Sequence, residues 1–173
     1  TVTEYISNVD DTSLAIVGMA GRFPDAPNID TFWQNVVGSV QSIRAFSDQD
    51  LKAAGVTAAL LAESRYVKAG TILNDIDAFD APFFGFTPRE AETMDPQSRL
   101  FLQCAWEALE DAGCDPDSYD GLIGVFAGKA PSEYLRHNLL TNSEILAQMG
   151  KMHLSSGNDA DALASMVAYK LNL

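Results

Sequence analysis

The chain has 173 residues, 47% hydrophobic and 20% charged, and this balance favours a folded domain with a sizeable core over disorder. Its formal net charge of −13 argues against nucleic-acid binding, because neutralising phosphates requires clustered Lys and Arg. No apolar run approaches the ~20 residues that a membrane helix needs. Residues 1–12 have neither the basic nor the apolar region of a signal peptide, so we expect a cytoplasmic protein without a membrane segment.

The first part of the chain predicts a strand followed by short helices. Residues 1–12 show no clear period and are predicted to be a linker, which places the start of the domain at residue 13. Residues 14–19 (LAIVGM) form a short apolar run with a glycine near its end, as in a buried strand. Helix starts are predicted at Asn28 or Asp30, at Ser47 and at Thr57, and loops or short edge strands over residues 67–81.

A long helix is predicted over residues 96–112. Asp95 is a good N-cap, and Pro96 suits the first helical position, where its missing N–H costs nothing. Gly113 is a natural stop. Apolar residues recur at steps of three and four along this segment, and additional apolar positions widen the stripe. We therefore expect the helix to be covered on more than one side.

The remainder of the chain predicts one more strand and two more helices. Residues 122–127 (LIGVFA) form a continuous apolar run, which is typical of a central strand covered on both faces by helices. Asn142 or Ser143 can cap a helix that runs to Met149, and a last helix is predicted over residues 159–169. Strands that alternate with helices indicate an α/β layered fold.

The residues with nucleophilic or metal-binding side chains form no catalytic constellation in the sequence. Cys104 falls on the apolar face of the long helix, where a thiol behaves as a small hydrophobe. Cys114 follows that helix in an acidic turn, which disfavours a thiolate. His137 and His153 are the only histidines, and their spacing supports no triad. Two cysteines are too few for a disulfide framework or a zinc site, so no metal is expected.

Two weaker patterns have simpler explanations. The glycines at positions 18 and 21 follow a predicted strand but lack the full dinucleotide-binding signature, so a tight turn explains them better than a nucleotide site. Lys129, Arg136 and Lys151 are the best candidate for a basic patch that could meet an acidic partner. Scattered solvated charges are the competing interpretation of these three residues.

Four sequence blocks carry a resemblance to a known family. In chain order they are IVGMAGRFP (16–24), FFGFTPREAETMDPQSRLFLQCAWEALEDAG (83–113), GLIGVFAG (121–128) and YKLNL (169–173). Together they resemble the N-terminal half of a β-ketoacyl synthase, above all the condensing domains of modular polyketide synthases and their hybrids with peptide synthetases. The resemblance covers residues 13–173. It implies the N-terminal half of a thiolase-like α-β-α-β-α layered fold, in a domain that works as a homodimer.

The resemblance also implies a chemistry, decarboxylative Claisen condensation. An acyl group passes from the phosphopantetheine of an acyl carrier protein to a cysteine, and the enolate of a malonyl-type extender then attacks the acyl thioester. In the family the nucleophilic cysteine and two catalytic histidines follow the position of Leu173. The chain is therefore expected to contain no catalytic residue, to bind no cofactor or metal itself, and to need the C-terminal half of the same domain for activity.

What the chain itself is expected to contribute is scaffold and pocket. In the family, the segment that matches residues 148–158 lies near the dimer interface and helps line the acyl pocket. Met149, Met152 and Leu154 are the implied wall residues, since flexible thioethers adapt to varied acyl chains. Ordinary interface packing is the alternative for these three. Met166 is a departure, because relatives often carry arginine at this position.

Two functional hypotheses of different classes follow from the sequence. The first is a ketosynthase segment that takes part in condensation. The second is a non-elongating ketosynthase-like domain that only binds or passes on acyl chains or supports dimerisation. An unrelated nucleotide-binding α/β domain is a third and weaker hypothesis.

Overall fold

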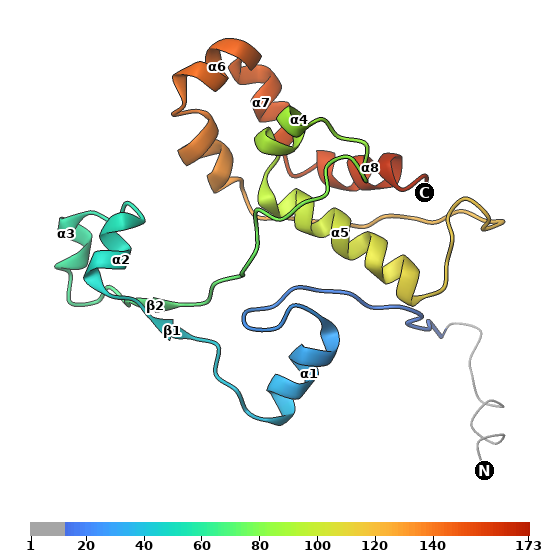
Figure 1. Ribbon diagram of the computed structural model, residues 1–173, viewed down its shortest axis with the longest axis horizontal. Helices are drawn as coiled ribbons and strands as arrows, with labels where there is room; N and C mark the ends of the chain where they lie inside the picture. Colours follow the sequence, from blue (N-terminus) through green and yellow to red (C-terminus); the bar gives the residue numbers. More distant parts are fainter. Residues whose placement is uncertain (1–12) are drawn as a thin grey trace.

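The computed structural model describes residues 13–173 and is built mainly of helices (Figure 1). The predicted linker, residues 1–12, lies outside the described residues. Within residues 13–173 the regular strands are β1 (Arg44–Ala45) and β2 (Ala69–Gly70), which pair antiparallel with Arg44 opposite Gly70. The helices are α1 (Ile29–Val37), α2 (Asp48–Ala53), α3 (Ala58–Leu61), α4 (Pro88–Thr93), α5 (Pro96–Asp111), η3 (Leu135–Leu139, a π-helical turn), α6 (Ser143–Met149), α7 (Lys151–Asn158) and α8 (Ala162–Lys170).

The long helix α5 begins as predicted and ends one residue before the predicted end. The Asp95 side chain accepts a hydrogen bond of 2.8 Å from the backbone N–H of Gln97, and Pro96 occupies the first turn. The helix ends at Asp111, and Gly113 follows with a φ of 63°, a conformation that glycine adopts without steric cost. Figure 1 shows that α5 lies at the centre of the molecule, with α8 beside it and an extended segment running along it.

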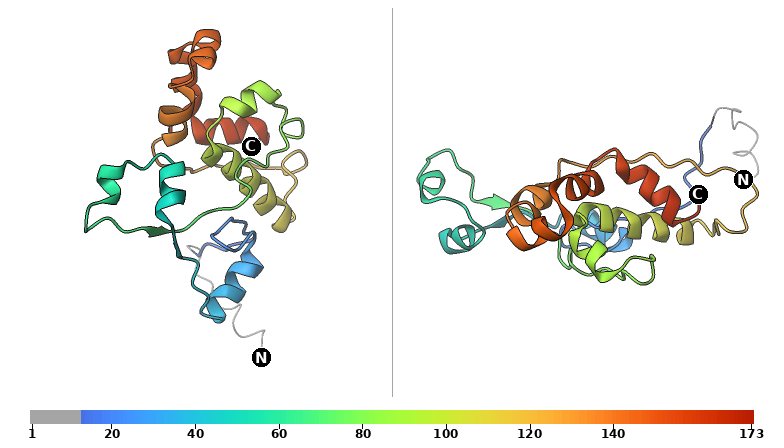
Figure 2. Two further views of the ribbon diagram at one scale, coloured as in Figure 1. Left: turned by 60° about the vertical axis from the view of Figure 1, so that its left-hand side comes forward. Right: turned by 90° about the horizontal axis from the view of Figure 1, so that it is seen from above.

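The main core forms between α5, α8 and the loop that precedes α4. Its buried members are Phe84, Leu102, Leu163, Val167 and Leu171. A second, smaller cluster joins η3, α6 and α7 through Leu139, Ile145 and Leu154. The two cores are separate, and Figure 2 shows η3, α6 and α7 rising as a lobe from the α5–α8 pair, while β1, β2, α2 and α3 project on another side.

The segment after residue 17 packs directly on α5. The backbone N–H of Met19 donates a hydrogen bond of 2.9 Å to the Asp111 carboxylate. The Arg22 guanidinium makes two hydrogen bonds to the Glu107 carboxylate, one of them 2.7 Å long. These hydrogen bonds, helped by the charge of Glu107, raise the pKa of Arg22. Arg22 therefore stays charged and fixes this segment on α5.

Gly18 lies so close to α5 that no other residue fits. A Cβ at this position would lie 2.3 Å from the carbonyl oxygen of Ala108. We predict that Gly18→Ala lowers the free energy of unfolding of the intact domain by ~1–3 kcal/mol, because the segment must move away from the helix. Gly157→Ala is the matched control, because a Cβ at this position meets nothing within 4 Å. Residue 157 also lies in α7, and alanine favours a helix. Denaturant unfolding of both variants gives the comparison, and equal stabilities would contradict the close packing.

The prediction of two buried strands is wrong for the described chain. Residues 14–19 and 122–127 are extended but pair with no other strand, and many of their side chains face solvent. Leu14 is 98% exposed, Leu122 101% and Phe126 96%. A central strand needs neighbouring strands at its edges and helices on both faces. The described residues cover only one face of the segment 122–127. Val125 and Ala127 pack on the main core, whereas Leu122 and Phe126 are exposed.

Four other predicted helix starts are confirmed, but the set of helices differs from the prediction. The caps are Asn28 for α1, Ser47 for α2, Thr57 for α3 and Asn142 for α6. The last helix begins at Ala162 rather than at residue 159, and α4, η3 and α7 were not predicted as helices. Two serines and a glycine give α7 low intrinsic helix propensity, so the packing of Leu154 and the hydrogen bonds of Asn158 hold this helix.

Candidate functional site

A buried amide joins the end of α7 to the turn between α4 and α5. Asn158 is only 4% exposed. Its side-chain oxygen accepts a hydrogen bond of 2.8 Å from the backbone N–H of Asp95. Its amide nitrogen donates to the carbonyl oxygens of Thr93, at 3.0 Å, and Leu154, at 2.8 Å. With these bonds Asn158 fixes the distance between α7 and the start of α5, where a cavity opens.

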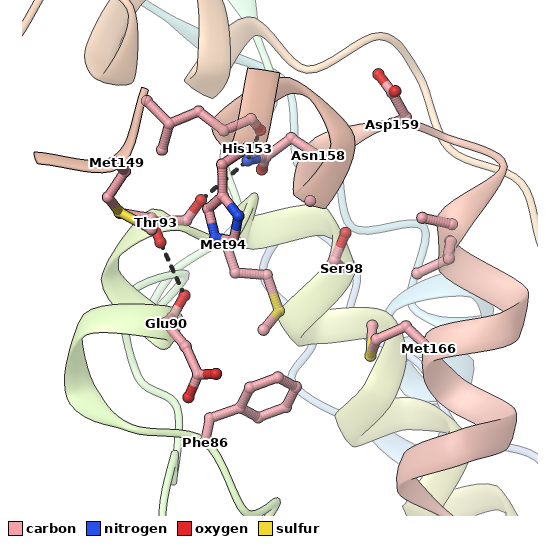
Figure 3. Close-up of a pocket in the computed structure, with 14 residues that line it drawn as sticks. Phe86, Glu90, Thr93, Met94, Ser98, Met149, His153, Asn158, Asp159 and Met166 are labelled. Carbon is pink, nitrogen blue, oxygen red and sulfur yellow. Dashed lines mark hydrogen bonds between the residues drawn. The ribbon is translucent and has the colours of Figure 1, made fainter. Parts of the chain in front are cut away.

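The cavity has a volume of about 210 Å³ and lies between α4, α5, α7 and α8. Figure 3 shows Met94, Met166 and Phe86 around this space, each from a different element. Its lining residues are Phe86, Glu90, Thr93, Met94, Ser98, Met149, His153, Leu154, Gly157, Asn158, Asp159, Ala162, Leu163 and Met166. The lining combines an apolar interior with a polar mouth.

Burial divides the lining residues into two groups. Met94, Leu154 and Leu163 are buried, and their side chains form the apolar interior. Glu90, His153 and Asp159 are exposed and lie at the rim. A concave apolar space with a few polar groups at its mouth is the usual form of a small-molecule site.

Phe86 is held in the wall by the C-terminal sequence block. The Lys170 ammonium group donates a hydrogen bond of 2.8 Å to the carbonyl oxygen of Gly85 and lies 3.7 Å from the centre of the Phe86 ring. A cation above an aromatic face is attracted by the ring quadrupole. The block at residues 169–173 thus positions part of the block at residues 83–113.

The structure brings together two of the three predicted wall residues. Met149 and Leu154 line the cavity. Met152 is 86% exposed and lies outside it, because the turn of α7 that buries Leu154 points Met152 to solvent. Phe86 and Met94 were not predicted as wall residues. The signal for them was their position as apolar residues inside the 83–113 block, and Met94 also directly precedes the predicted helix start at Asp95.

The predicted basic patch is divided in the structure. Lys129 points inward, and its ammonium group donates a hydrogen bond of 2.9 Å to the Ser98 hydroxyl. Burial lowers the pKa of Lys129 while Asp95 and Asp159 oppose that effect. Arg136 is paired with Glu133 at 3.0 Å, and Lys151 is exposed. The three residues therefore do not form a continuous positive surface in this chain.

The cysteines and histidines are not assembled into a reactive centre within residues 13–173. Cys104 is partly buried on α5, and burial raises the pKa of its thiol, which disfavours the nucleophilic thiolate. His137 lies 2.9 Å from Glu133 at the surface, and His153 lies at the cavity rim. Among the described residues no cluster of His, Cys, Asp and Glu could hold a metal ion, and no helix is long and apolar enough to cross a membrane.

Comparison with known proteins identifies the family. Residues 11–173 match the family model "Beta-ketoacyl synthase, N-terminal domain". A phenolphthiocerol/phthiocerol polyketide synthase of Mycobacterium tuberculosis is 46% identical over 172 residues, covering 96% of this chain and 12% of that protein. Pikromycin polyketide synthase component PikAII of Streptomyces venezuelae is 39% identical over 178 residues, covering 95% of this chain and 4% of that protein.

Solved structures agree with the sequence comparison. Ketosynthase twelve from the bacillaene polyketide synthase of Bacillus amyloliquefaciens superposes with a TM-score of 0.74 at 30% identity, covering 92% of this chain and 27% of that structure. The module 1 ketosynthase of the bacillaene synthase of the same species gives a TM-score of 0.72 at 29% identity, over 93% and 27%.

The chain belongs to the β-ketoacyl synthase family and represents its N-terminal domain. More narrowly, it is an N-terminal ketosynthase segment of a modular polyketide synthase, with the thiolase-like fold of its structural neighbours. The predicted fold class is thereby confirmed. The chain spans about a quarter of the solved ketosynthases and an eighth or less of the polyketide synthases named above.

Proposed function

We propose that the chain forms the N-terminal wall and scaffold of a ketosynthase that carries out decarboxylative Claisen condensation. An acyl group moves from the phosphopantetheine thiol of an acyl carrier protein to a cysteine, and the carrier thiol leaves. A malonyl-type extender loses carbon dioxide, and its enolate carbon attacks the acyl thioester, which releases the cysteine thiolate and forms a β-ketoacyl product.

The nucleophile of this reaction is proposed to lie outside this chain. Of the two cysteines, Cys104 is held in the thiol form by burial, and Cys114 is partly buried in a turn beside Asp115. We place the nucleophilic cysteine and two assisting histidines in the part of the domain that follows Leu173. The chain alone is then inactive, and its partners are that C-terminal half, a second copy of the domain and an acyl carrier protein.

The observation that carries the proposal is the meeting of two of the four family blocks beside one apolar cavity. Phe86 and Met94 come from the 83–113 block, and Lys170 of the last block holds Phe86 in place. Met149 and Leu154, which the family resemblance implied as pocket residues, complete the wall. An apolar cavity at this position supports the binding of an acyl chain, whereas it offers nothing to a nucleotide phosphate.

A condensation assay separates the proposed ketosynthase from a non-elongating domain. The intact domain is incubated with an acyl-pantetheine thioester and a malonyl-loaded carrier protein, and carrier-bound products are measured by mass spectrometry. We expect a β-ketoacyl carrier together with release of carbon dioxide. Acylation of the domain without any elongated product would instead support the domain that only holds or transfers acyl chains.

A further inference from the structure

The polar side chains inside the cavity are already engaged by the protein. The Thr93 hydroxyl donates to the carbonyl oxygen of Arg89 at 3.0 Å. Ser98 accepts a hydrogen bond from Lys129, and both amide hydrogens of Asn158 are used. Within the described residues, the one buried side-chain nitrogen or oxygen without a partner is the Nε atom of Arg99, which does not line the cavity. Each buried polar side chain of the interior therefore already has a partner in the protein, which leaves a ligand few groups to hydrogen-bond.

The polar groups that remain accessible are confined to the mouth. Glu90, His153 and Asp159 are exposed rim residues. The Glu90 carboxylate additionally accepts hydrogen bonds of 2.8 Å from the backbone N–H and the hydroxyl of Thr87. These bonds, the backbone one first, lower the pKa of Glu90, so the rim keeps a negative charge near neutral pH. A ligand group that enters beyond this rim meets mainly carbon and sulfur, because the polar side chains there are already hydrogen-bonded within the protein.

Three methionines contribute to the apolar lining. Met94, Met149 and Met166 come from three separate elements and line the same space. Methionine side chains are flexible and polarisable and adapt to apolar groups of varied shape. An apolar cavity of about 150 Å³ binds benzene, so the cavity of about 210 Å³ has room for a hydrocarbon segment of about six carbon atoms or more.

We infer that this cavity selects the distal part of an unsubstituted alkyl acyl chain and rejects chains that carry a hydroxyl group there. The inference rests on the proposed function and specifies the substrate class of the same site. A buried hydroxyl without a partner loses its hydrogen bonds to water and gains none. Met166 is assigned as the residue that keeps the α8 wall apolar.

Binding of two matched ligands to the intact ketosynthase domain tests the inference. Octanoyl-pantetheine amide and ω-hydroxyoctanoyl-pantetheine amide cannot transfer their acyl groups, so calorimetry reports binding alone. We expect the hydroxylated amide to bind about tenfold to a hundredfold more weakly, the range that corresponds to one stranded hydroxyl. Equal affinities, or no binding of the octanoyl amide, would overturn the inference.

Three variants locate the selection within the cavity. Met166→Gln keeps the length of the side chain but adds hydrogen-bonding groups, and it should reduce the preference for the alkyl chain several-fold. Met166→Leu keeps the wall apolar and should retain the preference even if Met166→Gln does not fold. Ser165→Gln places the same amide on the exposed neighbouring position of α8 and should leave the preference unchanged. A preference that Ser165→Gln and Met166→Gln alter equally, or that Met166→Leu abolishes, would contradict the assignment.

An acyl-transfer assay distinguishes this inference from the proposed function. The same intact domain is incubated with the thioesters that correspond to the two amides. Selective amide binding without acyl transfer would support the alkyl-selective cavity and reject the ketosynthase reaction. Acyl transfer at equal rates from both thioesters, together with equal amide affinities, would support the reaction and reject the selectivity.

Discussion

Produced by itself, the 173-residue chain is expected to self-associate rather than behave as a compact monomer. It exposes 12398 Å² of surface, whereas a globular protein of 18.7 kDa exposes roughly 8300 Å². Several large apolar side chains are exposed along the two extended segments, at Leu14, Ile16, Leu122 and Phe126. Apolar surface of this extent on a monomer leads to association or aggregation, and the unpaired strand edges add to that tendency.

Sedimentation measures the self-association of the chain, and binding of a hydrophobic dye measures its exposed apolar surface. Dye binding and association should both fall when Leu122 and Phe126 are replaced together by serine, because these side chains are exposed and the substitutions remove no core contact in this chain. They should also fall when the C-terminal part of the domain is co-expressed. A monomer of the unmodified chain that binds no dye and unfolds in one cooperative transition would contradict the account.

Leu102→Ala is expected to cause the largest loss of stability among single substitutions in α5. Leu102 is fully buried in the main core between α5 and α8. Removing its side chain should lower the free energy of unfolding of the intact domain by ~2–5 kcal/mol, through lost burial and the cavity left behind. Denaturant unfolding monitored by circular dichroism gives the value.

The matched control for Leu102→Ala lies on an exposed face of the same helix. Glu110 is exposed, so Glu110→Ala should change the free energy of unfolding by no more than ~0.5 kcal/mol. Comparable losses at the two positions would mean that α5 presents a different face to the core.

The boundaries of α5 were predictable from the sequence, to within one residue, because they depend on local chemistry. Asp95 and Pro96 start α5 through a side-chain hydrogen bond and a fixed φ angle, and both effects act within a few residues. The prediction of the two strands was wrong because strand formation depends on partners that are distant in the sequence. The runs at residues 14–19 and 122–127 have the composition of central strands, but a strand forms only with hydrogen-bonded neighbours, and the described chain does not supply them.

The candidate site was predictable only in part, for a related reason. Met149 and Leu154 were proposed from the family resemblance, and both line the cavity. Met94 and Met166 were not proposed, because the cavity wall is made by tertiary packing of α4, α5, α7 and α8, and no periodicity in one segment reveals it. The hydrogen bonds of Asn158, which connect residues more than sixty positions apart, leave no trace in local sequence pattern.

The site of acyl attachment tests the central claim most directly. The 173-residue chain and the intact domain are each incubated with octanoyl-pantetheine thioester, and adducts are located by intact mass and peptide mapping. We predict an adduct on the intact domain alone, at a cysteine beyond Leu173, because burial keeps Cys104 as a thiol. A stable acyl adduct on Cys104 or Cys114, in either protein, would contradict the account.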